Sequence, residues 1–91
     1  MKDITCTVTA VDSWRNSGRR TSQGLSIYSS NCPTIAAKPH VSKEEQDALA
    51  AGFELGRDYT FTVGGFAYFL ADDLGWGAVD LLGELPTEPA N

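Results

Sequence analysis

The sequence contains few of the residues that usually carry enzyme chemistry or metal binding. It has a single histidine, His40, and two cysteines, Cys6 and Cys32, among 91 residues. It lacks the Cys-x-x-Cys and His-x-x-x-His spacings of metal sites and the carboxylate-rich loop of calcium sites. We therefore expect no metal, no cofactor and no catalytic residue, and we interpret the chain as a binding protein and not an enzyme.

The reactive groups that are present are poorly arranged for catalysis. Cys32 and His40 are close in sequence, but no third side chain is evident that would orient the histidine. Asp72 and Asp73 are consecutive, and consecutive side chains on an extended chain point to opposite sides, so they rarely share one ligand. A solvated loop is the expected setting for His40 and for the aspartate pair.

Long apolar runs are also missing. The longest, residues 66–71, is much shorter than the roughly 20 residues that cross a bilayer, and the first residues do not resemble a signal peptide. We expect a soluble protein with no membrane partner, located in the cytoplasm, or in the host cytoplasm if a phage encodes it. In that compartment Cys6 and Cys32 are expected to be reduced thiols, with a disulfide between them as the alternative.

The charge is unevenly distributed along the chain. The formal net charge is −5, but residues 1–40 hold five Lys and Arg against two acids, and residues 41–91 hold two against ten. The first part therefore carries +3 and the second −8. Unless folding intermixes the two parts, one end can meet phosphate or an acidic partner and the other a basic partner.

Hydrophobic alternation with a period of two indicates a protein rich in strands. The segments expected to form strands are residues 4–14, 24–30, 58–63, 66–70 and 78–82. In the first of these, Ile4, Cys6, Val8 and Ala10 are expected to face the core. Residues 31–41 are interpreted as irregular because Pro33 and Pro39 interrupt them.

One helix is indicated, over residues 43–51. Ser42 followed by Glu45 forms a capping box, and Gly52 is expected to end the helix in the left-handed conformation. The glycine pair Gly64-Gly65 is expected to be a bulge or a bend between strands. The organisation expected is a single compact domain over residues 1–85 and a flexible C-terminal tail over residues 86–91.

These elements predict an α+β domain, a small antiparallel β-sheet or barrel of about five strands with one short helix packed on it. The order of the elements resembles that of the oligonucleotide-binding barrels, which also place their only helix between the middle and late strands. That resemblance implies a ligand site on the loop that joins the first two strands.

The first hairpin is the first candidate site. Its polar connection, residues 15–23, is expected to protrude as a mobile arm. Arg15, Arg19 and Arg20 match phosphate or carboxylate groups, and Trp14, with Tyr28 nearby in the hairpin, offers rings that stack on bases. The alternative is an ordinary hairpin tip whose charges prevent pairing between sheet edges.

Acidic and aromatic residues of the second part form the other candidate sites. The acidic residues expected to contribute to a negative face are Glu44, Glu45 and Asp47 on the helix, with Glu54, Asp58, Asp72, Asp73 and Asp80 elsewhere. Most of the aromatic residues after Gly65, including Phe66 and Tyr68, are expected in the core. Phe69 or Trp76 is then left outside as an interface residue.

The function predicted from these features is a protein-interaction module, a stoichiometric inhibitor or adaptor that docks on a protein or nucleoprotein complex. Small acidic phage proteins that disable host defence enzymes, anti-CRISPR proteins among them, have a similar general profile.

One alternative is a small single-stranded nucleic-acid-binding barrel that uses the 15–20 arm, although a charge of −5 opposes it. Another is a structural component of an assembly such as a virion. The sequence leaves the oligomeric state open.

Overall fold

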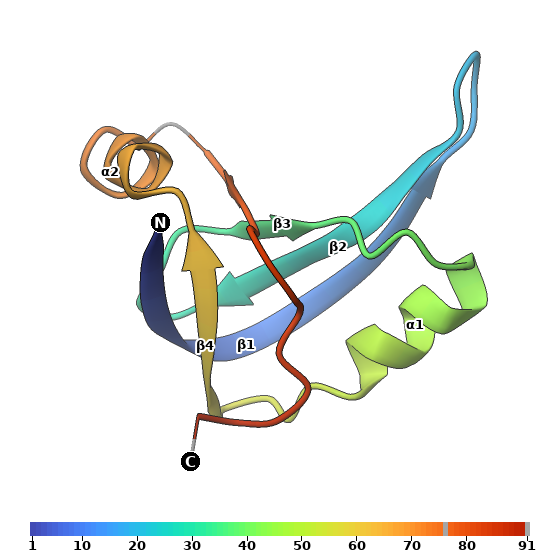
Figure 1. The fold of residues 1–91 in the computed structure, drawn as a ribbon. Coiled ribbons are helices and arrows are strands. Elements are labelled where there is room, and N and C mark those ends of the chain that lie inside the picture. Colours follow the sequence, from blue (N-terminus) through green and yellow to red (C-terminus); the bar gives the residue numbers. More distant parts are fainter. Residues whose placement is uncertain (76, 91) are drawn as a thin grey trace.

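The computed structural model describes residues 1–75 and 77–90, and it confirms the α+β class with a small sheet (Figure 1). The strands are β1 (Lys2–Asn16), β2 (Ser22–Ser29), β3 (Ile35–Ala37), β4 (Asp58–Val63) and β5 (Val79–Asp80), and the helices are α1 (Lys43–Ala51) and α2 (Gly65–Asp73). Within the described residues, both helices fall short of the length and apolarity that crossing a membrane requires.

The sheet has the strand order β4-β1-β2-β3-β5. All neighbouring strands are antiparallel except β3 and β5, which are parallel, so the sheet is mixed and not purely antiparallel as expected. The two edges approach each other, because Val63 of β4 forms a bridge with Leu81 and the Leu82 amide donates to the Thr62 carbonyl at 2.8 Å. The strands therefore form a curled, partly open barrel with a Greek-key order.

The core lies inside this curl. The inward residues expected from the alternation are largely confirmed, since Ile4, Cys6 and Val8 of β1 are buried. The expectation for Ala10 was wrong, because a β-bulge between Val8 and Ala10 shifts the register against β2. A bulge adds one residue to one strand and so reverses which side chains face the core beyond it. Ala10 is consequently exposed.

The first helix forms over the expected residues. The Ser42 hydroxyl accepts from the Glu45 amide at 3.1 Å, which is one half of the expected capping box. The Glu45 carboxylate accepts from the Ser42 hydroxyl at 3.4 Å, where the complete motif has it accept from the backbone amide of the N-cap residue. Gly52 does not adopt the left-handed conformation, as its φ is −75° and its ψ is −14°. Its amide instead continues the helical pattern and donates to the carbonyl of Ala48 at 3.0 Å.

The strand expected at residues 66–70 is wrong, because this segment belongs to α2. Gly64 is extended and begins the helix as its N-cap, and the Tyr68 amide donates to its carbonyl at 2.8 Å. Ala71 faces inward and is buried, whereas Phe66 and Phe69 are exposed. That spacing has the period of a helix, and a short apolar run alone does not distinguish it from a strand.

Two other expected boundaries also differ. The last strand, expected at 78–82, is reduced to Val79–Asp80 with a bridge at Leu81. Residues 31–41 were expected to be irregular, yet they contain β3 between Pro33 and Pro39. Beyond the barrel, the Ala90 amide donates to the Asp58 carbonyl at 2.6 Å, which brings the end of the chain beside the start of β4.

The expectation of reduced thiols is also corrected, because Cys6 and Cys32 form a disulfide with an S–S distance of 2.10 Å. The β1–β2 hairpin carries the chain back past Cys6, and the Ser30 amide donates to the Thr7 carbonyl at 3.1 Å beside it. The expectation of reduced thiols rested on the compartment alone, and a compartment does not indicate whether folding brings Cys6 and Cys32 together. Because disulfides persist mainly in oxidising compartments, the cytoplasmic location remains a prediction that this bond does not favour.

Candidate functional site

Trp14 and Tyr28 both lie on the outer face of β1, β2 and β3. Trp14 pairs with Gly24 and Ala10 pairs with Tyr28, and paired residues lie on the same face of a sheet. Gly24 and Tyr28 are four positions apart on β2, which separates the two aromatic positions by about 13 Å. Trp14 faces outward because of the bulge, since an uninterrupted alternation from Ile4 would have turned it inward.

Small side chains lie between the two aromatic residues. Ser26 stands at the intermediate position of β2, paired with Asp12 on one side and with Ala36 of β3 on the other. Tyr28 is 42 % exposed and Trp14 is half-buried. The face therefore presents two aromatic side chains across a surface of short residues.

Gly24 allows the indole of Trp14 to lie against the sheet. A Cβ atom at this position would be 3.0 Å from Cζ2 of Trp14 and 2.8 Å from the carbonyl oxygen of Ala37. The distance to the Ala37 carbonyl oxygen is too short for a Cβ atom, and the distance to the Trp14 ring is tight, so glycine at this position permits the close approach. Glycine at position 24 therefore determines where the Trp14 ring lies.

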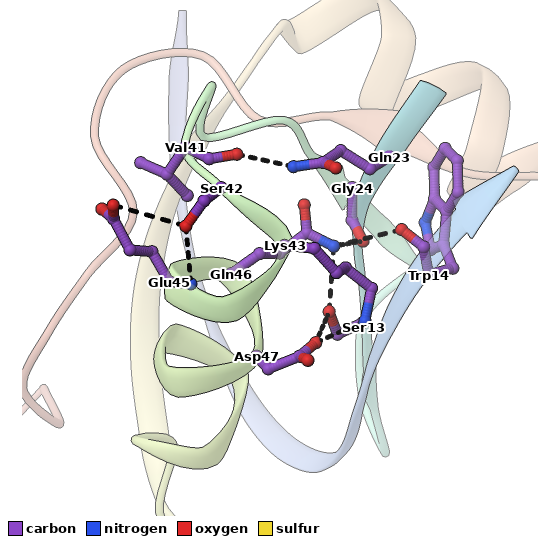
Figure 2. A network of polar contacts seen from close by, with 10 residues as sticks. All are labelled: Ser13, Trp14, Gln23, Gly24, Val41, Ser42, Lys43, Glu45, Gln46 and Asp47. Carbon is purple, nitrogen blue, oxygen red and sulfur yellow. Dashed lines mark hydrogen bonds and ion pairs between the residues drawn. The ribbon is translucent and has the colours of Figure 1, made fainter. Parts of the chain in front are cut away.

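A buried glutamine of α1 holds the same pair from the other side of the sheet (Figure 2). The amide nitrogen of Gln46 lies 3.1 Å from the Trp14 carbonyl, 2.8 Å from the Gly24 carbonyl and 2.9 Å from the Ser13 hydroxyl, and its two N–H groups are shared among these three acceptors. Gln46 is fully buried, and its Oε1 has no hydrogen-bond partner among the described residues. This contact was not predicted, because a glutamine in a polar helix resembles a surface residue.

Replacing Gln46 by leucine is expected to lower the free energy of unfolding by about 2 kcal/mol, since it removes the contacts of its amide with Ser13, Trp14 and Gly24, the last of them buried. Urea unfolding followed by circular dichroism measures the change. Glu44→Leu, an exposed substitution on the same helix, is the matched control and should change stability by less than about 0.5 kcal/mol. Equal effects of the two substitutions would contradict the role assigned to Gln46.

The arginines lie on and around the tip of the β1–β2 hairpin, which extends away from the barrel (Figure 1). Arg19 and Arg20 are exposed in the connection, whereas Arg15 is still within β1. Arg15 pairs with Gln23, so its side chain lies on the face opposite to Trp14. The salt bridges among the described residues involve Lys43 and Arg57 and leave these three arginines available.

Two further residues that the sequence did not single out as binding residues lie beside this arm. Lys38 and His40 line a pocket of about 240 Å³ together with Ser22 and Gln23 at the start of β2. Lys38 directly follows β3. Because residues 31–41 were interpreted as irregular, the position of Lys38 was not predicted. It adds a cation near the base of the arm.

The acidic residues do not form one face. Glu44, Glu45 and Asp47 are exposed on α1, whereas Asp72 and Asp73 lie at the end of α2, in a different part of the molecule (Figure 1). Trp76 lies outside the described residues. These two groups of acids therefore lie on two helices that are separated by the barrel.

Asp47 is engaged within the fold. Lys43 donates to its carboxylate at 2.6 Å and Ser13 does so at 2.6 Å. These bonds, that of Lys43 above all, lower the pKa of Asp47 from its usual value. Since the pKa is depressed in the folded chain, this stabilisation is present above the unfolded-state pKa and is lost as the pH falls through the lowered value.

No protein-family model, curated protein or solved structure matches this chain. Among the described residues, no group of three or more His, Cys, Asp or Glu side chains is placed to hold a metal ion. The arrangement that stands out chemically is the outer face of β1–β3 with the adjoining arm. It combines exposed aromatic surface with guanidinium groups, which suits a ligand that has both flat rings and negative charge.

Proposed function

We propose that the chain binds single-stranded nucleic acid on the outer face of β1, β2 and β3. The observation that carries the proposal is the placement of Trp14 and Tyr28 on one face, next to an arm that holds Arg19 and Arg20. Bases would stack on the two rings while the arginines neutralise phosphates. Stacking of this kind tolerates many sequences, because every base has an aromatic face.

The architecture supports the same proposal. A partly open, five-stranded Greek-key barrel with a helix between its third and fourth strands resembles the oligonucleotide-binding barrels. Those barrels bind their ligands on the face of the second and third strands and on the loop between the first two. In this chain, the same places hold Tyr28 and the arginine arm.

The net charge of −5 is compatible with this proposal because charge is local on the folded chain. Of the seven Lys and Arg residues, Arg15, Arg19, Arg20 and Lys38 lie on or beside the arm, and ten of the twelve acids follow residue 40. Affinity for a phosphate backbone depends on the cations that contact it, and screening limits the reach of distant acids to about 10 Å at moderate salt.

Replacing Trp14 by alanine is expected to weaken binding of a fluorescein-labelled oligothymidylate by at least about fivefold, because stacking contributes about 1–3 kcal/mol per base. Fluorescence anisotropy at low salt measures the affinity. Leu55→Ala is the control, since Leu55 is 62 % exposed in the segment before β4 and away from the face. Wild-type anisotropy that stays flat would overturn the proposed function.

A second candidate is the interaction module, a stoichiometric inhibitor or adaptor that docks on a nucleoprotein complex. Two carboxylates on the proposed face favour it, because Asp12 stands beside Ser26 and Asp80 pairs with Ala36. Carboxylates there repel phosphate and attract the basic groups of a protein surface. If a phage encodes the chain, its target would be a defence enzyme in the host cytoplasm.

A pull-down from lysate, with and without nuclease, separates the two candidates. Binding that survives nuclease supports the interaction module, particularly if Arg15/Arg19/Arg20→Glu abolishes it. Binding that disappears with nuclease supports the nucleic-acid proposal. Capture of the same protein by the wild type and by the triple variant would contradict docking through the arm.

A further inference from the structure

Helix α2 presents an uncovered aromatic stripe. Phe66 is 74 % exposed and Phe69 is 47 % exposed, and their ring centroids are 6.5 Å apart with an interplanar angle of 24°. Asp73 continues the same stripe, four positions after Phe69 and seven after Phe66. Large exposed aromatic residues in contact with each other are typical of an interaction surface.

The charges of α2 are arranged against its own dipole. The N-terminus begins at Gly64, which offers no side-chain hydrogen bond, and the first turn contains no acid. The last turn contains Asp72 and Asp73 and no basic residue. Because acids stabilise the N-terminus of a helix and oppose its C-terminus, the N-terminus of α2 lacks the carboxylates that lie at its C-terminus.

We propose that the chain forms a homodimer through α2, with the two copies of the helix antiparallel about a two-fold axis. In this arrangement Phe69 of each copy packs near the axis against Phe69 of the second copy. Asp73 of each copy then lies beside the N-terminal amides of the other helix, at Gly64 and Gly65. The same patch of each copy then contacts the same patch of the other, as an isologous interface requires.

The dimer is expected to be weak and to leave the arms free. A helix of nine residues covers less area than a standard protein interface, so the dimer should form only at high protein concentration. Helix α2 lies at the end of the molecule away from the hairpin tip, so pairing of α2 does not cover the arm (Figure 1). The dimer does not depend on the proposed nucleic-acid site, and either one can fail alone.

Sedimentation velocity of the full chain, over a concentration series of roughly two decades, tests this inference. The wild type should shift from monomer to dimer, and Phe66→Ser/Phe69→Ser should stay monomeric at every concentration. Leu55→Ser removes a similarly exposed apolar side chain elsewhere and should leave dimerisation unchanged. Circular dichroism confirms that each variant is folded.

Gly65→Asp tests the antiparallel arrangement itself. An added side chain meets no atom within 4 Å at this position, and an acid there favours the helix within one copy. It should nevertheless raise the dimer dissociation constant by at least about tenfold, because it faces Asp73 of the second copy. A wild type that remains monomeric, or a dimer that tolerates both the phenylalanine and the Gly65 substitutions, would overturn the inference.

Discussion

Reduction of the Cys6–Cys32 disulfide is expected to lower the free energy of unfolding by about 3.5 kcal/mol. The bond joins residues that are 26 positions apart, and cross-linking them restricts the unfolded chain. A domain of this size has little stability to spare, since typical values are about 5–15 kcal/mol. Urea unfolding of the wild type, with and without a phosphine reductant, measures the difference.

The control for this result is Cys6→Ala/Cys32→Ala. That variant should unfold at low urea concentration and should not respond to reductant, because it has no bond to break. Reductant that moves the midpoint of both proteins equally would indicate an effect unrelated to the disulfide. An unchanged wild-type midpoint, with free thiols demonstrated by alkylation, would contradict the stabilising role of the bond.

Reversing the charge of the arm, with Arg15, Arg19 and Arg20 all replaced by glutamate, is expected to weaken oligonucleotide binding by about a hundredfold or more at low salt. Two phosphate contacts on a single strand, those of Arg19 and Arg20, give a slope of about −1.4 in a plot of log affinity against log salt concentration. The variant loses those contacts and adds repulsion. Anisotropy titrations at several salt concentrations measure both the affinity and the slope.

Lys2→Glu provides the matched charge reversal outside the arm. Lys2 lies over the ring of Tyr68, with 4.4 Å from its Nζ to the ring centroid. Compared with the single variant Arg19→Glu, Lys2→Glu should have little effect on affinity or slope. Equal losses in the two single variants would show that binding follows net charge and not the arm.

Local signals in the sequence were sufficient for some elements. Helix α1 and strand β4 form over the expected residues, because Ser42 and Glu45 define the helix start and Tyr59, Phe61 and Val63 alternate along the strand. Each of these signals depends on near neighbours in the chain. The arginines of the arm were singled out in the same way, but Phe66, which was expected in the core, is exposed because its segment is a helix and not a strand.

Other features depend on contacts between distant residues. The bulge after Val8 reverses the outward side of β1 and so places Trp14 with Tyr28, which no local pattern indicates. Gln46 becomes a core residue only because α1 packs against Ser13 and Gly24. The disulfide likewise requires the hairpin to bring its two cysteines together. Local patterns in the sequence do not indicate which of these distant residues contact each other.

The most direct test of the proposed site is the fluorescence of Trp14 itself. In the variant Trp76→Phe, Trp14 is the only tryptophan in the chain, so its emission reports on the outer face of β1–β3. Addition of single-stranded oligothymidylate should quench this emission saturably, with the same dissociation constant that anisotropy gives. Binding detected by anisotropy while Trp14 emission stays unchanged would contradict a site on this face.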